Sequence, residues 1–167
     1  MDPGTASLGV AVLEQNDSSE PHCLFFSCLR TSKDEIMPTR ILQHYESLRR
    51  LVAEYRPEVL VYEGLYFNKN VRTALSVGAV IGVILLLAGQ ENLPLYTYSP
   101  LQVKMAIAGY GRASKEQIQD CLVMLLGLPA RPRPDDAADA LAIALCHTFT
   151  RHAAAGYQAA WRKERVG

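Results

Sequence analysis

The chain has 167 residues, of which 49% are hydrophobic and 20% are charged, and its 17 basic residues balance 17 acidic ones. This length suggests one domain, large enough to bury a core without a metal or disulfide staple. The composition excludes disordered, collagen-like and low-complexity classes, and the zero net charge excludes a simple polybasic nucleic-acid binder. We expect a single domain over residues 1–167, with residues 156–167 forming a basic tail.

The cysteines and the first residues of the chain point to the cytoplasm. The four cysteines form neither a C-x-x-C pair nor a paired zinc spacing, so we interpret them as reduced thiols. The first ten residues carry Asp2 and lack the long apolar core of a signal peptide. We therefore expect a cytoplasmic protein.

The first half of the chain predicts a β-hairpin, a helix and a strand. Apolar runs over residues 7–15 and 22–30 are separated by the polar turn NDSSEP. Residues 40–55 carry apolar side chains at helical spacing, which predicts an amphipathic helix. Residues 58–63 show little polar alternation, which is typical of an interior, parallel strand.

The segment from about residue 71 to 90 predicts a helix that is apolar on nearly every side. Residues 73–89 are uncharged, and the length of this stretch is at the lower limit for a membrane-spanning helix. Gly78 and Gly82 form a G-x-x-x-G pattern that lets helices approach closely. Because its flanks resemble strands of an α/β protein, we favour a soluble protein in which a sheet covers one side of this helix and a second subunit covers the other.

The second half predicts one more strand, over residues 95–98, and then three helices. These cover residues 100 to about 109, 115 to 127, and 135 to about 154. Ser99 is an N-cap before a proline, and Ser114 with Gln117 forms a capping box. Strands interleaved with helices predict an α/β fold, with a mixed sheet flanked by helices on both faces.

Several acidic residues lie where composition alone does not place them. Asp2 opens a D-P-G turn, where it could simply hydrogen-bond nearby backbone groups. Glu63 ends the interior strand, a position where α/β proteins bind ligands, although a strand-end charge reaching water is the alternative. Capping and the helix dipole explain Asp135 or Asp136 without any function.

Asp139 is harder to explain structurally. It lies one turn into a helix of alanine and leucine, and it shares a helix face with Asp136. Two carboxylates on one face repel each other unless a positive group lies between them. The pair therefore predicts a divalent cation with oxygen ligands, and Mg²⁺ is the obvious candidate.

The middle of the neutral chain is basic. Between residues 64 and 115 the only acid is Glu91, whereas the bases are Lys69, Arg72, Lys104, Arg112 and Lys115. Tyr66 and Phe67 lie beside Lys69, and aromatic residues next to bases suit unstacked nucleotides and phosphates. A solvated loop with two core aromatics is the alternative.

Together these segments resemble the RuvC Holliday-junction resolvases of bacteria. The matching pieces are Asp2-Pro3-Gly4 with Gly9, YEGLYFNKN, SVGAVIGV, SPLQVKMAIAGYGRASKEQIQ and DDAADALAIAL, in family order as far as about His147. The resemblance implies an RNase H-like fold and a homodimer. It also implies an Mg²⁺-dependent endonuclease that nicks a four-way DNA junction symmetrically in recombination and repair, together with the RuvA–RuvB branch-migration complex.

The resemblance also assigns roles to individual residues. It implies that the catalytic, metal-binding carboxylates are Asp2, Glu63, Asp136 and Asp139. Two Mg²⁺ ions, or Mn²⁺ in their place, would lie roughly 3.5–4 Å apart in such a site. The predicted DNA-binding residues are Tyr66, Phe67, Lys69, Arg72, Lys104, Arg112 and Lys115, with Tyr66 near the crossover. The division of roles between Asp135 and Asp136 stays open.

One departure and two alternatives accompany this resemblance. The family has an apolar strand before the D-P-G aspartate, whereas only Met1 precedes Asp2 in this sequence. We therefore expect the natural chain to start about five or six residues earlier. In a structure of these 167 residues we expect either a loosely held Asp2 or a gap beside residues 58–63. One alternative is another RNase H-like nuclease that acts on RNA or other branched DNA. The other is an actin-like or sugar-kinase-like nucleotide-binding domain, in which a D-x-G turn meets phosphate.

Overall fold

The computed structural model describes residues 1–16, 20–64 and 71–163, with residues 71–73 and 152–163 described by their backbone alone. The elements are β1 (Ser7–Glu14), β2 (His22–Arg30), α1 (Met37–Tyr55), β3 (Leu60–Glu63), α2 (Val71–Gln90), β4 (Leu95–Tyr98), α3 (Pro100–Ala108), α4 (Lys115–Leu126) and α5 (Asp135–Lys163). Their order is the predicted one. The last helix was predicted too short, because α5 continues past Ala154 to Lys163.

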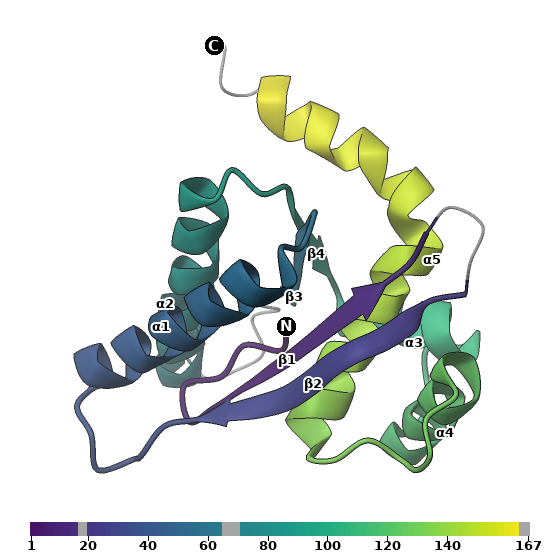
Figure 1. The fold of residues 1–167 in the computed structure, drawn as a ribbon, viewed down its shortest axis with the longest axis horizontal. Helices are drawn as coiled ribbons and strands as arrows, with labels where there is room; N and C mark the ends of the chain where they lie inside the picture. The colour runs from purple at the N-terminus through teal and green to yellow at the C-terminus, as the bar shows by residue number, and fades with distance from the viewer. Residues whose placement is uncertain (17–19, 65–70, 164–167) are drawn as a thin grey trace.

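The strands form two pairs that the first two residues of the chain connect. β1 and β2 are antiparallel, whereas β3 and β4 are parallel. The Met1 amino group donates to the Val61 carbonyl at 2.8 Å, and the Glu63 amide donates to the Met1 carbonyl at 3.0 Å. Asp2 and Gly9 exchange two backbone hydrogen bonds of 2.9 Å. The N-terminus therefore lies between β1 and β3 (Figure 1).

Helices cover both faces of this strand assembly, as predicted. α1 and α2 lie on one side and α3, α4 and α5 on the other (Figure 1). The period-2 alternation of strands produces this division. Val10 and Leu60 belong to the core under α1 and α2, whereas their neighbours Ala11 and Val61 pack against the core under α3, α4 and α5.

The helices that carry candidate site residues are capped as the sequence predicts. Ser99 and Ser114 each form a complete capping box with the glutamine three residues later, which fixes the starts of α3 and α4. Gly109 and Gly127 end these helices with positive φ angles of 81° and 60°. The second capping box places Lys115 at the first residue of α4.

The apolar helix α2 is buried on one side only. Val80, Ile84 and Leu87 are fully or almost fully buried in the core under α1 and α2. The opposite side exposes Leu75, Ala79, Gly82, Leu85 and Leu86. Within the described part of the chain, no helix combines the length and hydropathy that crossing a membrane requires.

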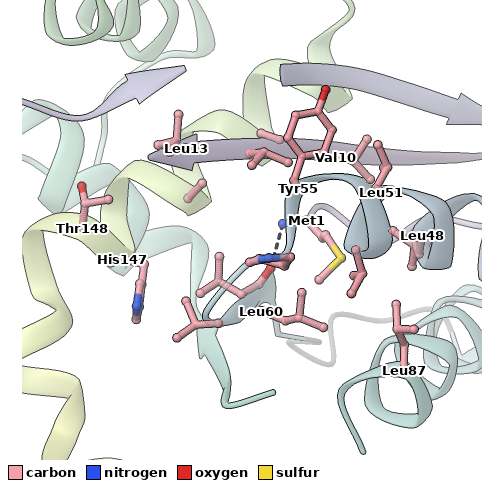
Figure 2. Close-up of a pocket in the computed structure, with 17 residues that line it drawn as sticks. Met1, Val10, Leu13, Leu48, Leu51, Tyr55, Leu60, Leu87, His147 and Thr148 are labelled. Atoms are coloured by element: carbon pink, nitrogen blue, oxygen red, sulfur yellow. Dashed lines mark hydrogen bonds between the residues drawn. The ribbon is translucent and has the colours of Figure 1, made fainter. Parts of the chain in front are cut away.

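An apolar cavity of about 130 Å³ lies beside β3, next to Met1. Figure 2 shows the side chains of Val10, Leu48 and Leu60 gathered around it. The expected gap beside residues 58–63 is therefore present. The alternative expectation of a loosely held Asp2 was wrong, because Asp2 is paired with Gly9.

Candidate active site

Asp2 and Glu63 lie side by side where the two strand pairs meet. Asp2 is fixed by its pairing with Gly9 of β1, and Glu63 is the last residue of β3. The hydrogen bond from the Glu63 amide to the Met1 carbonyl joins the two segments. Glu63 is thus held at the end of a parallel strand, as the sequence predicted.

Asp136 and Asp139 enter from the first turns of α5. The helix begins at Asp135, where the amides of residues 137 and 138 donate to the Pro134 carbonyl. α5 approaches β1 at Gly9, where a Cβ atom would overlap the Asp136 carbonyl and lie 3.2 Å from the Asp2 Cβ. The absence of a side chain at Gly9 therefore lets the start of α5 lie over Asp2.

The charges of the candidate carboxylates reach Asp2 and Glu63. Burial, followed by the charges of Asp2 and Asp139, raises the pKa of Glu63 to about 7. Burial raises the pKa of Asp2 to about 6, and the charges of Asp139 and Asp136 add to this effect. Asp2 is thus within electrostatic reach of the two α5 aspartates and of Glu63.

Lys115 supplies positive charge at this cluster. Its Nζ donates to Asp139 Oδ2 at 3.1 Å, and this hydrogen bond is the main cause of the raised pKa of Lys115. The lysine side chain is 59% exposed, so it can exchange this carboxylate for another anion without crossing a packed core. Lys115 was predicted as a DNA contact, and the structure adds its ion pair with Asp139.

Asp135 has different partners. It accepts hydrogen bonds from Arg133 Nη1 at 2.7 Å and from Gln119 Nε2 at 3.3 Å. These contacts tie the start of α5 to the preceding loop and to α4. The structure therefore separates Asp135 from Asp136, a distinction that the sequence left open.

The predicted DNA-binding residues are only partly described. Lys104 on α3 is half-buried, Arg112 is exposed between α3 and α4, and neither forms an ion pair with a described residue. The predictions for Tyr66, Phe67 and Lys69 lie outside the described residues, and Arg72 is described by its backbone alone.

The loop after Asp2 is held by a network that the sequence analysis missed. The Thr5 carbonyl accepts from Thr31 Oγ1 at 2.7 Å and lies 3.0 Å from His44 Nε2. Arg40 Nε donates to Thr31 Oγ1 at 2.9 Å. Burial lowers the pKa of His44, which is 1% exposed. No local pattern signals these contacts, because they join residues from three separate elements.

Cys28 on β2 was also missed. Its Sγ donates to Asp136 Oδ2 at 3.5 Å. Cys28 pairs with Gly9 across the β1–β2 ladder, so it lies beside the start of α5. The contact depends on strand register, which the sequence around Cys28 does not reveal.

The donor set of the cluster fits a hard divalent cation. Its side chains offer carboxylate oxygens, which Mg²⁺ and Mn²⁺ prefer, and a positive ion would relieve the carboxylate repulsion that adds to burial in raising the pKa values of Asp2 and Glu63. Among the described residues, no three His, Cys, Asp or Glu side chains are already arranged as a finished metal site. Metal binding would therefore require the carboxylates to adjust.

Comparisons with known proteins agree with this arrangement. The family described as "Crossover junction endodeoxyribonuclease RuvC" matches residues 1–147. The chain is 47% identical to such a protein from Moorella thermoacetica, over 88% of this chain and 87% of the relative. It is 48% identical to one from Roseiflexus sp., over 89% and 88% of the two chains.

Solved structures show the same likeness. Thermus thermophilus RuvC in complex with a Holliday junction substrate superposes with a TM-score of 0.85 at 35% identity, covering 90% of this chain and 91% of that one. A second T. thermophilus RuvC structure gives a TM-score of 0.79 over 90% and 92% of the two chains. The α/β fold is thus RNase H-like, as predicted, and the chain belongs to the RuvC family of crossover junction endodeoxyribonucleases.

Proposed function

We propose that this chain resolves four-way (Holliday) DNA junctions as a metal-dependent endonuclease in recombination and repair. The observation that carries the proposal is that the partly buried Asp2 and Glu63 lie near the α5 aspartates, so that burial, and then the charges of neighbouring carboxylates, raise the pKa values of Asp2 and Glu63. The family consists of metal-dependent nucleases, and a relative of known structure binds a junction substrate.

Asp2, Glu63, Asp136 and Asp139 are the proposed catalytic metal ligands, for two Mg²⁺ ions or for Mn²⁺ in their place. When bound, such ions supply an activated water and neutralise charge at the leaving 3′ oxygen. The protein's own contribution is position and protonation. Asp2 and Glu63 must lose protons for the metal to bind, while Gly9 lets the start of α5 approach Asp2 and the loop network holds the segment that follows Asp2.

Lys115 has two proposed roles, one at the carboxylates and one at the DNA substrate. While it pairs with Asp139, its ammonium partly compensates the negative cluster. We propose that a DNA phosphate takes over this ammonium when cations reach the carboxylates. Lys104 and Arg112 extend the same basic surface, and Tyr66, Phe67, Lys69 and Arg72 complete the proposed DNA contacts, with Tyr66 stacking on a base near the crossover.

A homodimer is the proposed active form. The exposed apolar side of α2 carries Leu75, Ala79, Gly82 and Leu86 at helical spacing, and such a side favours burial against a second copy. Two-fold symmetry would place two sites for paired nicks in a junction with matching symmetry.

We further propose one nuclease domain with a basic tail over residues 156–167, action in the cytoplasm, and cooperation with the RuvA–RuvB complex.

A cleavage assay tests the proposal. The chain is incubated with a four-way junction or with a linear duplex of the same sequences, with and without Mg²⁺. Paired nicks in the junction that require Mg²⁺ support the function, whereas equal cutting of both substrates contradicts junction selectivity. A thermal shift with ATP but no metal-dependent cleavage would instead support the nucleotide-binding alternative.

A further inference from the structure

Three residues line up across the strands beside the proposed metal site. Gly9 of β1 is flanked by Asp2 on one side and by Cys28 of β2 on the other. Residues directly opposite one another on neighbouring strands project from the same face of a sheet. The Asp2 carboxylate and the Cys28 thiol therefore lie on the face that α5 covers, with the gap at Gly9 between them.

Asp136 occupies this gap. Its backbone carbonyl lies over Gly9, and its side chain receives the Cys28 thiol through the 3.5 Å hydrogen bond from Sγ to Oδ2. Asp2 lies on the side of Gly9 opposite Cys28, and the charge of Asp136 also acts on Asp2. Asp136 thus lies between a carboxylate that repels it and a thiol that donates to it.

We propose that Cys28 is a positioning residue that orients Asp136 for metal binding, an inference that rests on the proposed function. A hydrogen bond to one carboxylate oxygen restricts rotation of the carboxylate and presents the other oxygen to a cation. Groups that hydrogen-bond to metal ligands commonly act in this way, and losing one of these groups typically weakens metal binding or activity by about 10–100-fold.

Cysteine suits this position for a physical reason. A neutral S–H group donates to Asp136 without adding a further negative charge to four carboxylates. An acidic residue there would add repulsion, and a long cation would compete with the metal for Asp136.

The test compares Cys28→Ala, Cys28→Ser and, as a matched control, Cys23→Ala. Cys23 lies on the same strand but pairs with Leu13 and packs against the core under α3, α4 and α5. The first readout is Mn²⁺ affinity without DNA, from thermal shift titration and electron paramagnetic resonance. The second is the Mg²⁺ concentration for half-maximal junction cleavage, recorded separately from the rate at saturating Mg²⁺.

We expect Cys28→Ala to weaken Mn²⁺ binding about 10-fold, the lower end of the usual range because a thiol is a weak donor. The Mg²⁺ requirement should rise in parallel, while the saturated rate changes little. Cys28→Ser should recover most of the loss, because its hydroxyl donates to the same oxygen, and Cys23→Ala should match the wild type.

Equal metal affinity in Cys28→Ala and the wild type would overturn the positioning role while leaving the proposed nuclease intact. A loss shared by Cys28→Ala, Cys28→Ser and Cys23→Ala would reduce Cys28 to ordinary packing. A wild-type chain that neither binds Mn²⁺ nor cuts junctions would overturn the proposed function itself, and the positioning role with it.

Discussion

A single missing side chain decides how closely the carboxylates meet. At Gly9 the start of α5 rests on β1, and Asp2 and Cys28 lie on either side of it. Any Cβ atom at this position would push against the backbone of Asp136, which cannot move without shifting α5. The proposed site therefore depends on backbone contact as much as on its acidic side chains.

Gly9→Ala should lower both stability and activity. Overpacking typically costs about 1–3 kcal/mol, so we expect a lower melting temperature and strongly reduced Mg²⁺-dependent cleavage. Gly82→Ala is a suitable control for the stability measurement, because a Cβ there meets no described residue within 4 Å outside its own helix. Wild-type stability and cleavage for Gly9→Ala, measured by calorimetry and the junction assay, would contradict the proposed contact.

Glu63 predicts a specific pH dependence of stability. Its pKa is raised from 4.5 to about 7, so over this range the folded chain binds more protons at Glu63 than the unfolded chain does. The contribution of Glu63 to stability is therefore present at low pH and is lost as the pH rises through about 7. Burial is the main cause, and the charges of Asp2 and Asp139 follow.

Glu63→Gln removes this titration. We would measure the free energy of unfolding in urea without metal. The difference between the variant and the wild type should shift in favour of the variant as the pH rises from about 4.5 to about 7. The Met1 amino group, whose pKa burial lowers to about 5, opposes the trend in both proteins, and losing the Glu63 charge would strengthen this opposition in the variant, in the direction that we expect. A difference that stays constant with pH would show that Glu63 is not perturbed.

The sequence singled out Asp139 and Glu63 because each is out of place locally. Asp136 followed from the helix face that it shares with Asp139, whereas the role of Asp2 came only from the family resemblance. Asp139 interrupts an alanine and leucine helix, and Glu63 ends an apolar strand. Cys28 could not be found in this way. Its position beside Asp136 depends on the β1–β2 register, which shifts between Val12 and Leu13, and on where α5 crosses the strands.

At the scale of elements, the helices and strands were predictable because their ends carry chemical signals. The capping boxes at Ser99 and Ser114 and the positive-φ glycines fixed α3 and α4 closely. α1 starts at Met37 rather than at residue 40, because Pro38 is accepted in a first helical turn. The bridge between the strand pairs was not predictable, because a two-residue segment has no periodicity.

The cavity beside β3 predicts that an added strand would stabilise the fold. Extending the chain before Met1 by a short Ile/Val-rich segment would fill about 130 Å³ and replace a buried amino group by a peptide amide. The cavity opens to solvent, so an added strand would stabilise the chain by burying the apolar lining, which is worth about 25 cal/mol per Å² of apolar surface removed from water. We expect a higher melting temperature than for a Ser/Gly extension of equal length, and equal melting temperatures would contradict the prediction.

At the scale of the whole molecule, the exposed side of α2 is the surface on which the proposed homodimer, and with it the proposed paired cutting, depends. The helix buries one side against α1 and the strands and leaves leucines exposed on the other. The sequence predicted that two surfaces must cover this helix, and the structure shows one of them. The partner surface could not be predicted, because a single chain contains no information on the orientation of its second copy.

Gly82→Leu should separate dimerisation from folding. Among the described residues, a Cβ at Gly82 meets no atom within 4 Å outside its own helix, so we expect a larger side chain to fit the monomer and helix propensity to stabilise it by up to about 1 kcal/mol. In a dimer the same leucine would hold two helices apart. We expect sedimentation to show more monomer and cleavage to lose paired nicks first, whereas Gly82→Ala should remain closer to the wild type. A Gly82→Leu protein that is as dimeric as the wild type at low concentration would place the interface elsewhere.

The central claim is that the carboxylates converging on Asp2 carry out metal-dependent junction cleavage. The most direct measurement is the rate of junction cutting in Mg²⁺ by Asp139→Asn, together with its affinity for the junction. Asp135→Asn is the matched control, because Asp135 is four residues away on the same helix but pairs with Arg133 and Gln119. We predict that Asp139→Asn binds the junction but cuts it more than about 100-fold more slowly than the wild type does. Losing a metal ligand should reduce the rate more than losing a group that only hydrogen-bonds to a ligand. Asp135→Asn should cut at close to the wild-type rate, whereas an Asp139→Asn protein that cuts as fast as Asp135→Asn would contradict the proposed site.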